Sequence, residues 1–498
     1  MKTIGLLALL PVALLAAGCA KDYEIIYPQD EDDRPSRSGE HLFRPAGPRR
    51  TDLSTEGTAN CYVVSAPGDY SFNAGVRGNG KTPVGDLSGA TVEELWSTFN
   101  SAVAPRPGEL ITDLGISDGT VTFTVPDPMT DGNVVVAVRG GGGEILWSWH
   151  LWLLQGYSPE VSAHKYNHDA GIMIDRNLGA LSASVGDPRS VGFLYQWGRK
   201  DPFPSAVSFS DRKATPYATS VPWPEYLQAG TIETAVRNPM RFMGADFAHQ
   251  DWYVFDSYDD PLAEGRWSRD KTEFDPCPPG WRVPDGGASG VWAAAFGRGR
   301  SFSAENYWQT GRYGYDFRGQ LADGVEVVWY PTTAYLNSGF GSLSGQGQYA
   351  MYWACSTFGW NDEYGRMDER ANQFYFYTNA SIQPSQSYVR AQGCAVRCLK
   401  EGTYYGVPLK GLGIGTEGCK EMNLTIGVGE KRQLPLVFTP GNASNKTLVA
   451  VSDDPSFVQA DSYGCVTGVR ATYGPVLVRF ISIDGDYEVW CHVSVAKN

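Results

Sequence analysis

The stretch "DPCPPGWRVPDGG" at residues 275–287, called the proline loop below, restricts the fold of this chain more than any other. Its four prolines fix the backbone, remove amide donors and push the residues before them toward extended geometry. Neither a helix interior nor a central strand tolerates so many prolines. The stretch therefore predicts a stiff loop, and the tryptophan within it, Trp281, predicts that the loop is fixed to a core.

Composition predicts many short strands joined by turns. The chain has 498 residues, which suggests about three domains. Aromatic residues make up 13% of the sequence, and it contains 58 glycines and 31 prolines. This mixture favours a mainly β, multidomain fold over helical bundles. The net charge of −14 argues against nucleic acid or an anionic membrane surface as a partner, because neither attracts an acidic protein.

The N-terminus has the pattern of an exported chain. Lys2 precedes the apolar run "IGLLALLPVALLAAGC", which is too short to span a bilayer and ends in small residues before Cys19. The run resembles a bacterial lipobox, although Ala16 stands where that motif usually has leucine. The resemblance implies that residues 1–18 are a lipoprotein signal peptide and that Cys19 is lipidated, with palmitate as one acyl chain. An uncleaved anchor helix is the alternative, and the proline within the run counts against it.

Residues 19–57 predict a lipidated cysteine followed by a flexible tether. They are polar, with the acidic run "QDEDD" and the basic run "GPRR", and hold too few apolar side chains to offset the entropy of ordering. The segment "AKDYE" resembles the signal that sends lipoproteins to the cell surface in Bacteroidota-type bacteria. That resemblance implies an outer-membrane protein, exposed at the cell surface and attached to the membrane through its lipid.

The first folded block, residues 58–156, reads as a β domain. "TVTFTV" alternates apolar residues with threonines, which predicts a half-buried strand. "ILWSWHLWL" is apolar on both faces, so we expect a central strand whose tryptophans lie in the core. The phrases "ANCYVV", "PGDYSF", "RGNG" and "ILWSWHLWL" resemble the N-terminal module of fimbrillin-like surface lipoproteins, and this resemblance implies a β-sandwich.

The second block, residues 157–401, combines short strand signals with many glycines. It carries "IMIDRNLGA", "GFLYQWGRKDPFP", the proline loop, "YWACSTFG" and "GCAVRCLKE" in that order. The order resembles the Fibrobacter succinogenes major paralogous domain family. That family looks related to the C-type-lectin-like fold, a loop-rich α+β unit.

The second resemblance gives the proline loop a role. It implies that Trp281 fills the core and that Arg282 points toward a partner. It also implies that Cys277 forms a disulfide with one of two cysteines near the end of the domain, Cys394 or Cys398.

The last block, residues 417–498, follows a linker at 402–416. "MNLTIGVGEKRQLPLVFTP" alternates apolar and polar residues, and "VLVRFISIDGDYEVWCHVSV" predicts a hairpin around the Asp484–Gly485 dipeptide. In the second arm of that hairpin, alternation predicts one face made of Tyr487, Val489, Cys491, Val493 and Val495. "VGEKRQL", "SDDPSF" and "GCVTGV" resemble a group 2 bacterial immunoglobulin-like domain, which implies a small β-sandwich. Ala450–Val451 stand where that family often has tryptophan.

Two common hydrolase signatures, GxSxG and HExxH, are absent from the sequence. "HKYNH" spaces His164 and His168 for a metal only in a helix, and the surrounding residues favour a loop. The cysteines that remain beside Cys19 do not show zinc-ligand spacing. We therefore expect no catalytic residues, no metal and no cofactor.

Two groups of residues are candidates for ligand binding. Trp360, Asn361 and Asp362 match the short "WND" motif that contributes oxygen ligands to a sugar-binding calcium in C-type lectins, and a surface turn is the alternative. Tyr313 and Tyr315, in a glycine-rich stretch with Tyr349 further on, offer flat apolar faces with polar tips. Such faces suit glycans or proteins. The alternative is that these rings pack the loops of their own domain.

Together the resemblances imply a non-enzymatic surface lipoprotein that acts in adhesion or as a component associated with a fimbrium. Its partners would then be fimbrial subunits, a host protein or a glycan. A glycan-binding accessory lipoprotein of a polysaccharide-capture system is the alternative, and an enzyme of unrecognised mechanism ranks third.

Overall fold

The computed structural model describes most of the chain after residue 50 and two short segments before it. The described residues are 23–24, 44–45, 50–210, 214–246, 250–255, 260–287, 290–296, 308–361, 367–378, 381–402, 409–441, 443, 446, 448–461, 463–482 and 487–497. The chain divides into two units, Met1–Thr51 and Asp52–Asn498. In the first, β1 (Tyr23–Glu24) pairs with β2 (Arg44–Pro45), a short pairing that the expected tether did not include.

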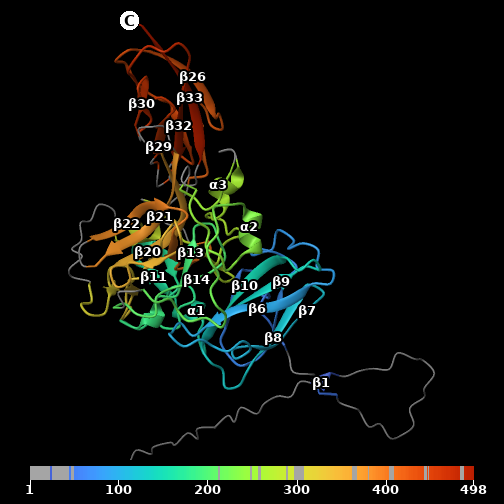
Figure 1. Cartoon of the computed structure of the whole chain (residues 1–498). Coiled ribbons are helices and arrows are strands. Elements are labelled where there is room, and N and C mark those ends of the chain that lie inside the picture. Colours follow the sequence, from blue (N-terminus) through green and yellow to red (C-terminus); the bar gives the residue numbers. More distant parts are fainter. Residues whose placement is uncertain are drawn as a thin grey trace, which may run out of the picture. The chain divides into compact units, whose positions relative to one another are not determined.

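The second unit is mainly β and contains several sheets, which confirms the predicted fold class (Figure 1). Its helices are short, as expected for a chain rich in glycine and proline. They are α1 (Pro159–Ser162), α2 (Ile232–Arg237), α3 (Pro261–Gly265), α4 (Val291–Phe296) and the 3-10 turns η1 (Asn167–Asp169) and η2 (Pro188–Ser190). Among the described residues, no helix has both the length and the apolar character needed to cross a bilayer.

The N-terminal region folds as two four-stranded sheets. Strand β10 lies between β4 and β9, so the run "ILWSWHLWL" is central as predicted, and Trp147, Trp149 and Trp152 are buried. Strand β8 buries alternate residues, which confirms the half-buried strand. The first sheet has the order β4 (Cys61–Val64), β10 (Ile145–Leu153), β9 (Gly132–Arg139), β6 (Thr91–Thr98). The second sheet has the order β3 (Thr51–Asp52), β5 (Gly68–Asn73), β8 (Thr120–Val125), β7 (Thr112–Ser117).

The middle region combines a four-stranded sheet, an eight-stranded sheet and a short hairpin. The eight-stranded sheet contains the long antiparallel strands β20, β21 and β22, and β22 lies at the end of the strand order. The four-stranded sheet has the order β11 (His164–Tyr166), β12 (Gly171–Met173), β24 (Leu399–Lys400), β15 (Trp281–Arg282). The eight-stranded sheet has the order β14 (Phe203–Pro204), β13 (Phe193–Gln196), β23 (Gly393–Ala395), β20 (Tyr349–Asn361), β21 (Met367–Tyr377), β22 (Ser381–Val389), and β18 (Tyr335–Leu336) with β19 (Leu343–Ser344) joins it at β23. The hairpin consists of β16 (Gly314–Asp316) and β17 (Trp329–Pro331).

The proline loop is held from within by side chains that replace the missing backbone hydrogen bonds. The carboxylate of Asp275 accepts hydrogen bonds from the amides of Cys277 and Val283, each at 2.8 Å. The ammonium of Lys271 donates to Asp275 at 3.0 Å and to the carbonyl of Cys277 at 2.9 Å. The stiffness of this loop therefore comes from the buried ion pair between Asp275 and Lys271 as well as from its prolines.

A disulfide joins the proline loop to the end of the middle region. Cys277 bonds to Cys398, with an S–S distance of 2.05 Å, whereas Cys394, the other partner that the sequence left open, is a buried free thiol. Trp281 is 2% exposed and pairs in β15 with Lys400 of β24. The loop is thus fixed to the last strand of its own region.

One hydrophobic core extends over both the N-terminal and the middle regions. Its buried members run from Cys61 to Cys398. The side chain of Asn60 donates to the carbonyls of Glu273 and Asp275 at 2.7 and 2.9 Å and accepts from the indole of Trp147 at 2.8 Å. Buried side chains on both sides of position 157 therefore depend on one another.

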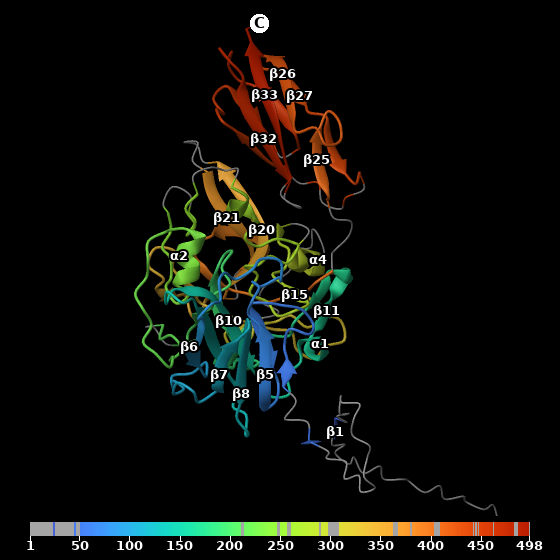
Figure 2. The same ribbon diagram turned by 90° about the vertical axis from the view of Figure 1, so that its right-hand side faces the viewer.

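The C-terminal region is a separate sandwich with its own core. Strand β33 buries every second residue, Val489, Cys491, Val493 and Val495, as its sequence predicts, and pairs with β32. The turn residues Asp484 and Gly485 lie outside the described part. Figure 2 shows β26, β33 and β32 side by side. The four-stranded sheet has the order β26 (Glu421–Gly427), β33 (Glu488–Ala496), β32 (Val476–Ser482), β29 (Leu448–Ser452). The three-stranded sheet has the order β27 (Lys431–Gln433), β31 (Cys465–Gly468), β30 (Val458–Ala460), and β25 (Gly411–Ile414) pairs with β28 (Leu436–Thr439).

Candidate binding sites

Several predicted residues lie where the structure describes no side chain. Cys19 and Asp362 are outside the described residues. Trp360 and Asn361 end strand β20, but their side chains are not described. The calcium hypothesis for this triplet therefore remains a prediction.

Tyr315 belongs to the core, which corrects its assignment as a ligand-contacting residue. Its side chain is fully buried in β16. The ring stacks on Phe317 at 5.2 Å and meets Phe376 edge-on at 4.7 Å, and burial raises the pKa of its phenol. Tyr313 precedes β16 and has a positive φ, so it does not continue the strand, whereas Tyr315 lies within β16 with its side chain in the core.

Arg282 also differs from the prediction that it points toward a partner. It is 1% exposed and donates to Asp285 at 2.7 Å and to the carbonyl of Val283 at 3.0 Å. Burial alone would raise the pKa of Asp285, but the guanidinium groups of Arg282 and Arg269 outweigh it and hold that pKa below its ordinary value. Arg282 therefore stabilises the proline loop.

The two histidines of "HKYNH" do not share a helix face. His164 begins β11, and His168 lies in η1 with a φ of 59°. Among the described residues there is no cluster of three or more histidine, cysteine, aspartate or glutamate side chains able to hold a metal ion.

Tyr313, in contrast, lines a surface hollow of about 620 Å³, called the Tyr313 hollow below. Its ring stacks on Phe209 with centroids 5.6 Å apart. Its φ is 60°, a conformation that costs free energy for a bulky residue. Thr332 compensates by donating from its amide and its hydroxyl to the carbonyl of Tyr313, at 2.8 and 3.0 Å. The hollow is lined by Phe209, Ser210, Tyr313, Gly345, Gln346, Gly347 and Gln348.

Next to this hollow lies a group of tyrosines that the sequence analysis missed. In β21, Phe374 and Phe376 are fully buried, whereas Tyr375 and Tyr377 alternate to the opposite face and are half-buried. Tyr349 of β20 lies directly across from Tyr377, and their ring centroids are 4.7 Å apart. The pattern "FYFY" at 374–377 was the available signal, since phenylalanine alternates there with tyrosine. We call Tyr335, Tyr349, Tyr375, Tyr377 and Tyr388 the tyrosine face.

Burial raises the pKa of three phenols of the tyrosine face. It raises the pKa of Tyr375 to about 12, with smaller contributions from the neighbouring tyrosines. Burial likewise raises the pKa of Tyr335 and of Tyr388. At physiological pH these phenols remain hydrogen-bond donors as well as acceptors.

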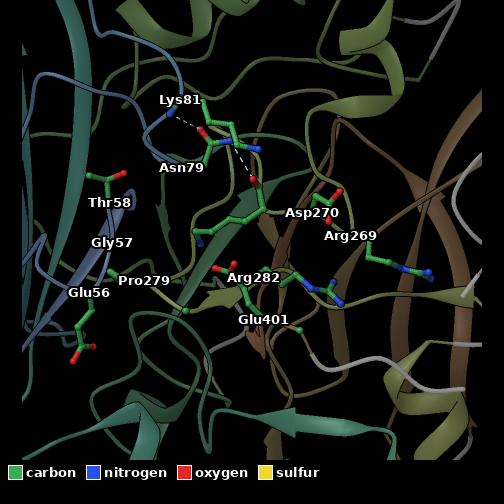
Figure 3. A pocket seen from close by; sticks show the side chains of 13 residues that line it. Glu56, Gly57, Thr58, Asn79, Lys81, Arg269, Asp270, Pro279, Arg282 and Glu401 are labelled. Carbon is green, nitrogen blue, oxygen red and sulfur yellow. Dashed lines mark hydrogen bonds between the residues drawn. The ribbon is translucent and has the colours of Figure 1, made fainter. Parts of the chain in front are cut away.

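A second hollow, the junction cavity, has a different chemistry. It measures about 440 Å³ and is lined by residues of both the N-terminal and the middle regions. Figure 3 shows Glu56 and Thr58 on one side and Arg269 on the other. Asn79 donates to the carbonyl of Lys271 at 3.1 Å, and burial raises the pKa of Glu401. The cavity mixes cations with carboxylates, and none of its described lining residues is aromatic.

Comparisons with known proteins do not assign a family. No protein-family model matches the chain, and no curated protein sequence matches it. Among solved structures, domains 4 and 5 of the S-layer protein SbsC align at 14% sequence identity over 31% of this chain and 76% of that chain, with a TM-score of 0.14. Domains 1–6 of SbsC align at 10% identity over 88% of this chain and 53% of that chain, with a TM-score of 0.15. The insect immune protein hemolin aligns at 9% identity over 89% of this chain and 98% of that chain, with a TM-score of 0.13. Overlaps with such TM-scores carry no inference about fold or function.

Proposed function

We propose that this chain is a lipid-anchored protein of the bacterial outer membrane, displayed at the cell surface, where its middle region binds a ligand without transforming it. The observation that carries the binding role is the Tyr313 hollow beside the tyrosine face, an aromatic surface open to solvent. The residues that the structure describes around that hollow include no carboxylate, imidazole or thiol, the groups that acid–base and nucleophilic catalysis use most often.

Adhesion, alone or in association with a fimbrium, is the role that fits this proposal first. It is supported by the resemblance of residues 58–156 to fimbrillin-like lipoproteins and by the lipobox-like sequence at Cys19. A glycan-binding accessory role in polysaccharide capture is the second candidate. The amides of Gln346 and Gln348 beside aromatic rings favour it, because sugars offer both hydroxyl groups and apolar ring faces.

Anchoring and display are tested in cells that express the full chain. We expect radiolabelled palmitate to attach to the wild type and not to Cys19→Ser, and externally added protease to cleave the wild type on intact cells. A soluble, unlabelled wild-type protein would contradict the anchor.

The binding role is tested separately from the anchor. Cells that express the wild type should adhere to immobilised host proteins, or the purified protein should capture fimbrial subunits. Substrate turnover that disappears in Glu401→Gln, within the junction cavity, would replace the binding role with an enzymatic one.

A further inference from the structure

The Tyr313 hollow and the tyrosine face are parts of one surface. The loop of residues 345–348, "GQGQ", connects them, and its glycines let it approach the rings closely. A Cβ at Gly345 would lie 2.7 Å from the ring of Tyr349 and 2.8 Å from that of Tyr335. A Cβ at Gly347 would lie 3.2 Å from the ring of Tyr313. Aromatic rings therefore continue from the hollow, past the loop, onto the sheet.

Backbone strain is concentrated around the same loop. Tyr313, Ala334 and Thr378 have positive φ values of 60°, 57° and 38° although none is glycine. Each is tied to the loop or its neighbours: the amide of Thr378 donates to the carbonyl of Gln348 at 2.8 Å, and the amide of Ala334 to that of Tyr349 at 3.2 Å. Strained residues that the surrounding structure fixes in place are characteristic of binding sites. This observation is independent of the aromatic content.

We propose that this continuous surface binds a neutral polysaccharide chain, with the rings of Tyr313, Tyr349 and Tyr375 against the apolar faces of successive sugar units. The inference rests on the binding role proposed above and names its ligand class. The exposed side chain of Gln348 provides an amide donor and an acceptor for the sugar hydroxyl groups.

The described lining of the Tyr313 hollow favours a neutral ligand over an acidic one. Its described residues include no arginine or lysine, which a carboxylated or sulfated glycan would need, and no aspartate or glutamate that would attract a cationic ligand.

Two substitutions remove rings from this surface. Tyr313→Asn keeps a residue that tolerates positive φ and removes the ring. Tyr375→Ala removes a half-buried ring of β21 that also packs against the core, so its folding is checked alongside its binding. Tyr473→Ala is the matched control, because Tyr473 is fully exposed in the C-terminal sandwich.

The experiment uses the purified full-length protein in a detergent without a sugar headgroup. Immobilised mannan, xylan, galactomannan and β-glucan serve as neutral probes, and polygalacturonate and hyaluronan as acidic ones. We expect the wild type to bind at least one neutral polysaccharide, and each ring-removing substitution to weaken that binding about ten-fold, which corresponds to about 1.4 kcal/mol. Tyr473→Ala should bind as the wild type does, and circular dichroism should show all variants folded.

Three results would overturn the inference: no binding to any neutral probe, stronger binding to the acidic probes, or wild-type affinity in both Tyr313→Asn and Tyr375→Ala. A protein ligand whose capture depends on Tyr313 would also replace it. Because binding by the purified protein does not require membrane anchoring, failure of palmitate labelling at Cys19 would affect the proposed display and leave this result standing.

Discussion

The core that spans residues 58–401 and the core of the C-terminal sandwich are stabilised by different interactions. In the first, Asp251, Arg266 and Arg390 have completely buried side chains, and a disulfide closes the proline loop. Among the described residues of the C-terminal sandwich, the buried polar side chains are the two serines Ser452 and Ser482, and no charged side chain is buried.

The difference shows that the two regions respond to substitution differently. A core of alternating valines tolerates the loss of one contact at a cost proportional to the area exposed. A core with buried charges depends on complete sets of partners, since removing one leaves the other without compensation in a low dielectric. Four experiments test this contrast, and tryptophan fluorescence suits them because 14 of the 15 tryptophans precede residue 401.

Of the four changes, Asp251→Ala should lower the free energy of unfolding most. The carboxylate of Asp251 accepts from Arg266 at 3.0 Å and lies 3.7 Å from the guanidinium of Arg390. Its loss removes the carboxylate that pairs with the buried Arg266 and leaves Arg390 with its second carboxylate, Glu264. We expect the free energy of unfolding in urea to fall by about 3–5 kcal/mol. Glu233→Ala, which removes an exposed pair with Arg237, should cost less than about 1 kcal/mol. Equal effects would show that burial does not decide how much a charged pair contributes to stability.

Removal of the disulfide should cause the second largest loss of unfolding free energy. The bond links residues 121 positions apart, so its removal restores much of the freedom of the unfolded chain. The double variant Cys277→Ser/Cys398→Ser should lose about 2–5 kcal/mol of unfolding free energy. Cys419→Ser, at an exposed free cysteine, is the control and should unfold as the wild type does. Peptide mapping without reduction should find the 277–398 bridge, and a bridge to Cys394 instead would contradict the structure.

Asn60→Ala tests whether the N-terminal and middle regions form one cooperative core. The substitution leaves the carbonyls of Glu273 and Asp275 and the indole of Trp147 without their partner. We expect a loss of about 2–3 kcal/mol in urea unfolding, with a single transition. Asn423→Ala, on an exposed position of β26, should change stability by less than about 0.5 kcal/mol. Two separate transitions in the wild type would show that the regions unfold independently.

The smallest of the four changes in the free energy of unfolding should be the pH-dependent one that His150 contributes. Burial lowers the pKa of His150 to about 3, from about 6.5 in the unfolded chain, and Asn133 lies 2.8 Å from its Nε2. Below pH 6.5 the unfolded chain therefore gains a proton that the folded chain does not, and stability falls as the pH decreases. Between pH 7.5 and 5.5 the wild type should lose about 1.4 kcal/mol more than His150→Gln. Parallel pH profiles of the two proteins would contradict this assignment.

Local patterns in the sequence predicted the parts of the molecule that depend on neighbours along the chain. Alternation in residues 120–125 and 488–496 predicted strands and their buried faces correctly. The prolines of the proline loop predicted its stiffness, and Trp281 its attachment to the core. In each case the deciding constraint, a fixed φ or a two-residue period, acts over a few residues.

The errors arose where side chains meet across large distances in the sequence. Tyr315 and Tyr313 look equivalent in their glycine-rich segment, and only the packing of Phe317 and Phe376 places the first inside. Arg282 turns inward because Asp285 is buried beside it. The tyrosine face was missed because its members come from four strands between residues 335 and 388.

By itself, the sequence determined a mainly β chain with a stiff proline-rich loop, a central tryptophan-rich strand and a C-terminal sandwich with one apolar face per strand. Tertiary structure decided which cysteine closes the loop, which tyrosines remain at the surface and which charges are buried together. The physical reason is range: backbone restriction and periodicity are local properties of the chain, whereas burial and pairing exist only after distant segments have packed.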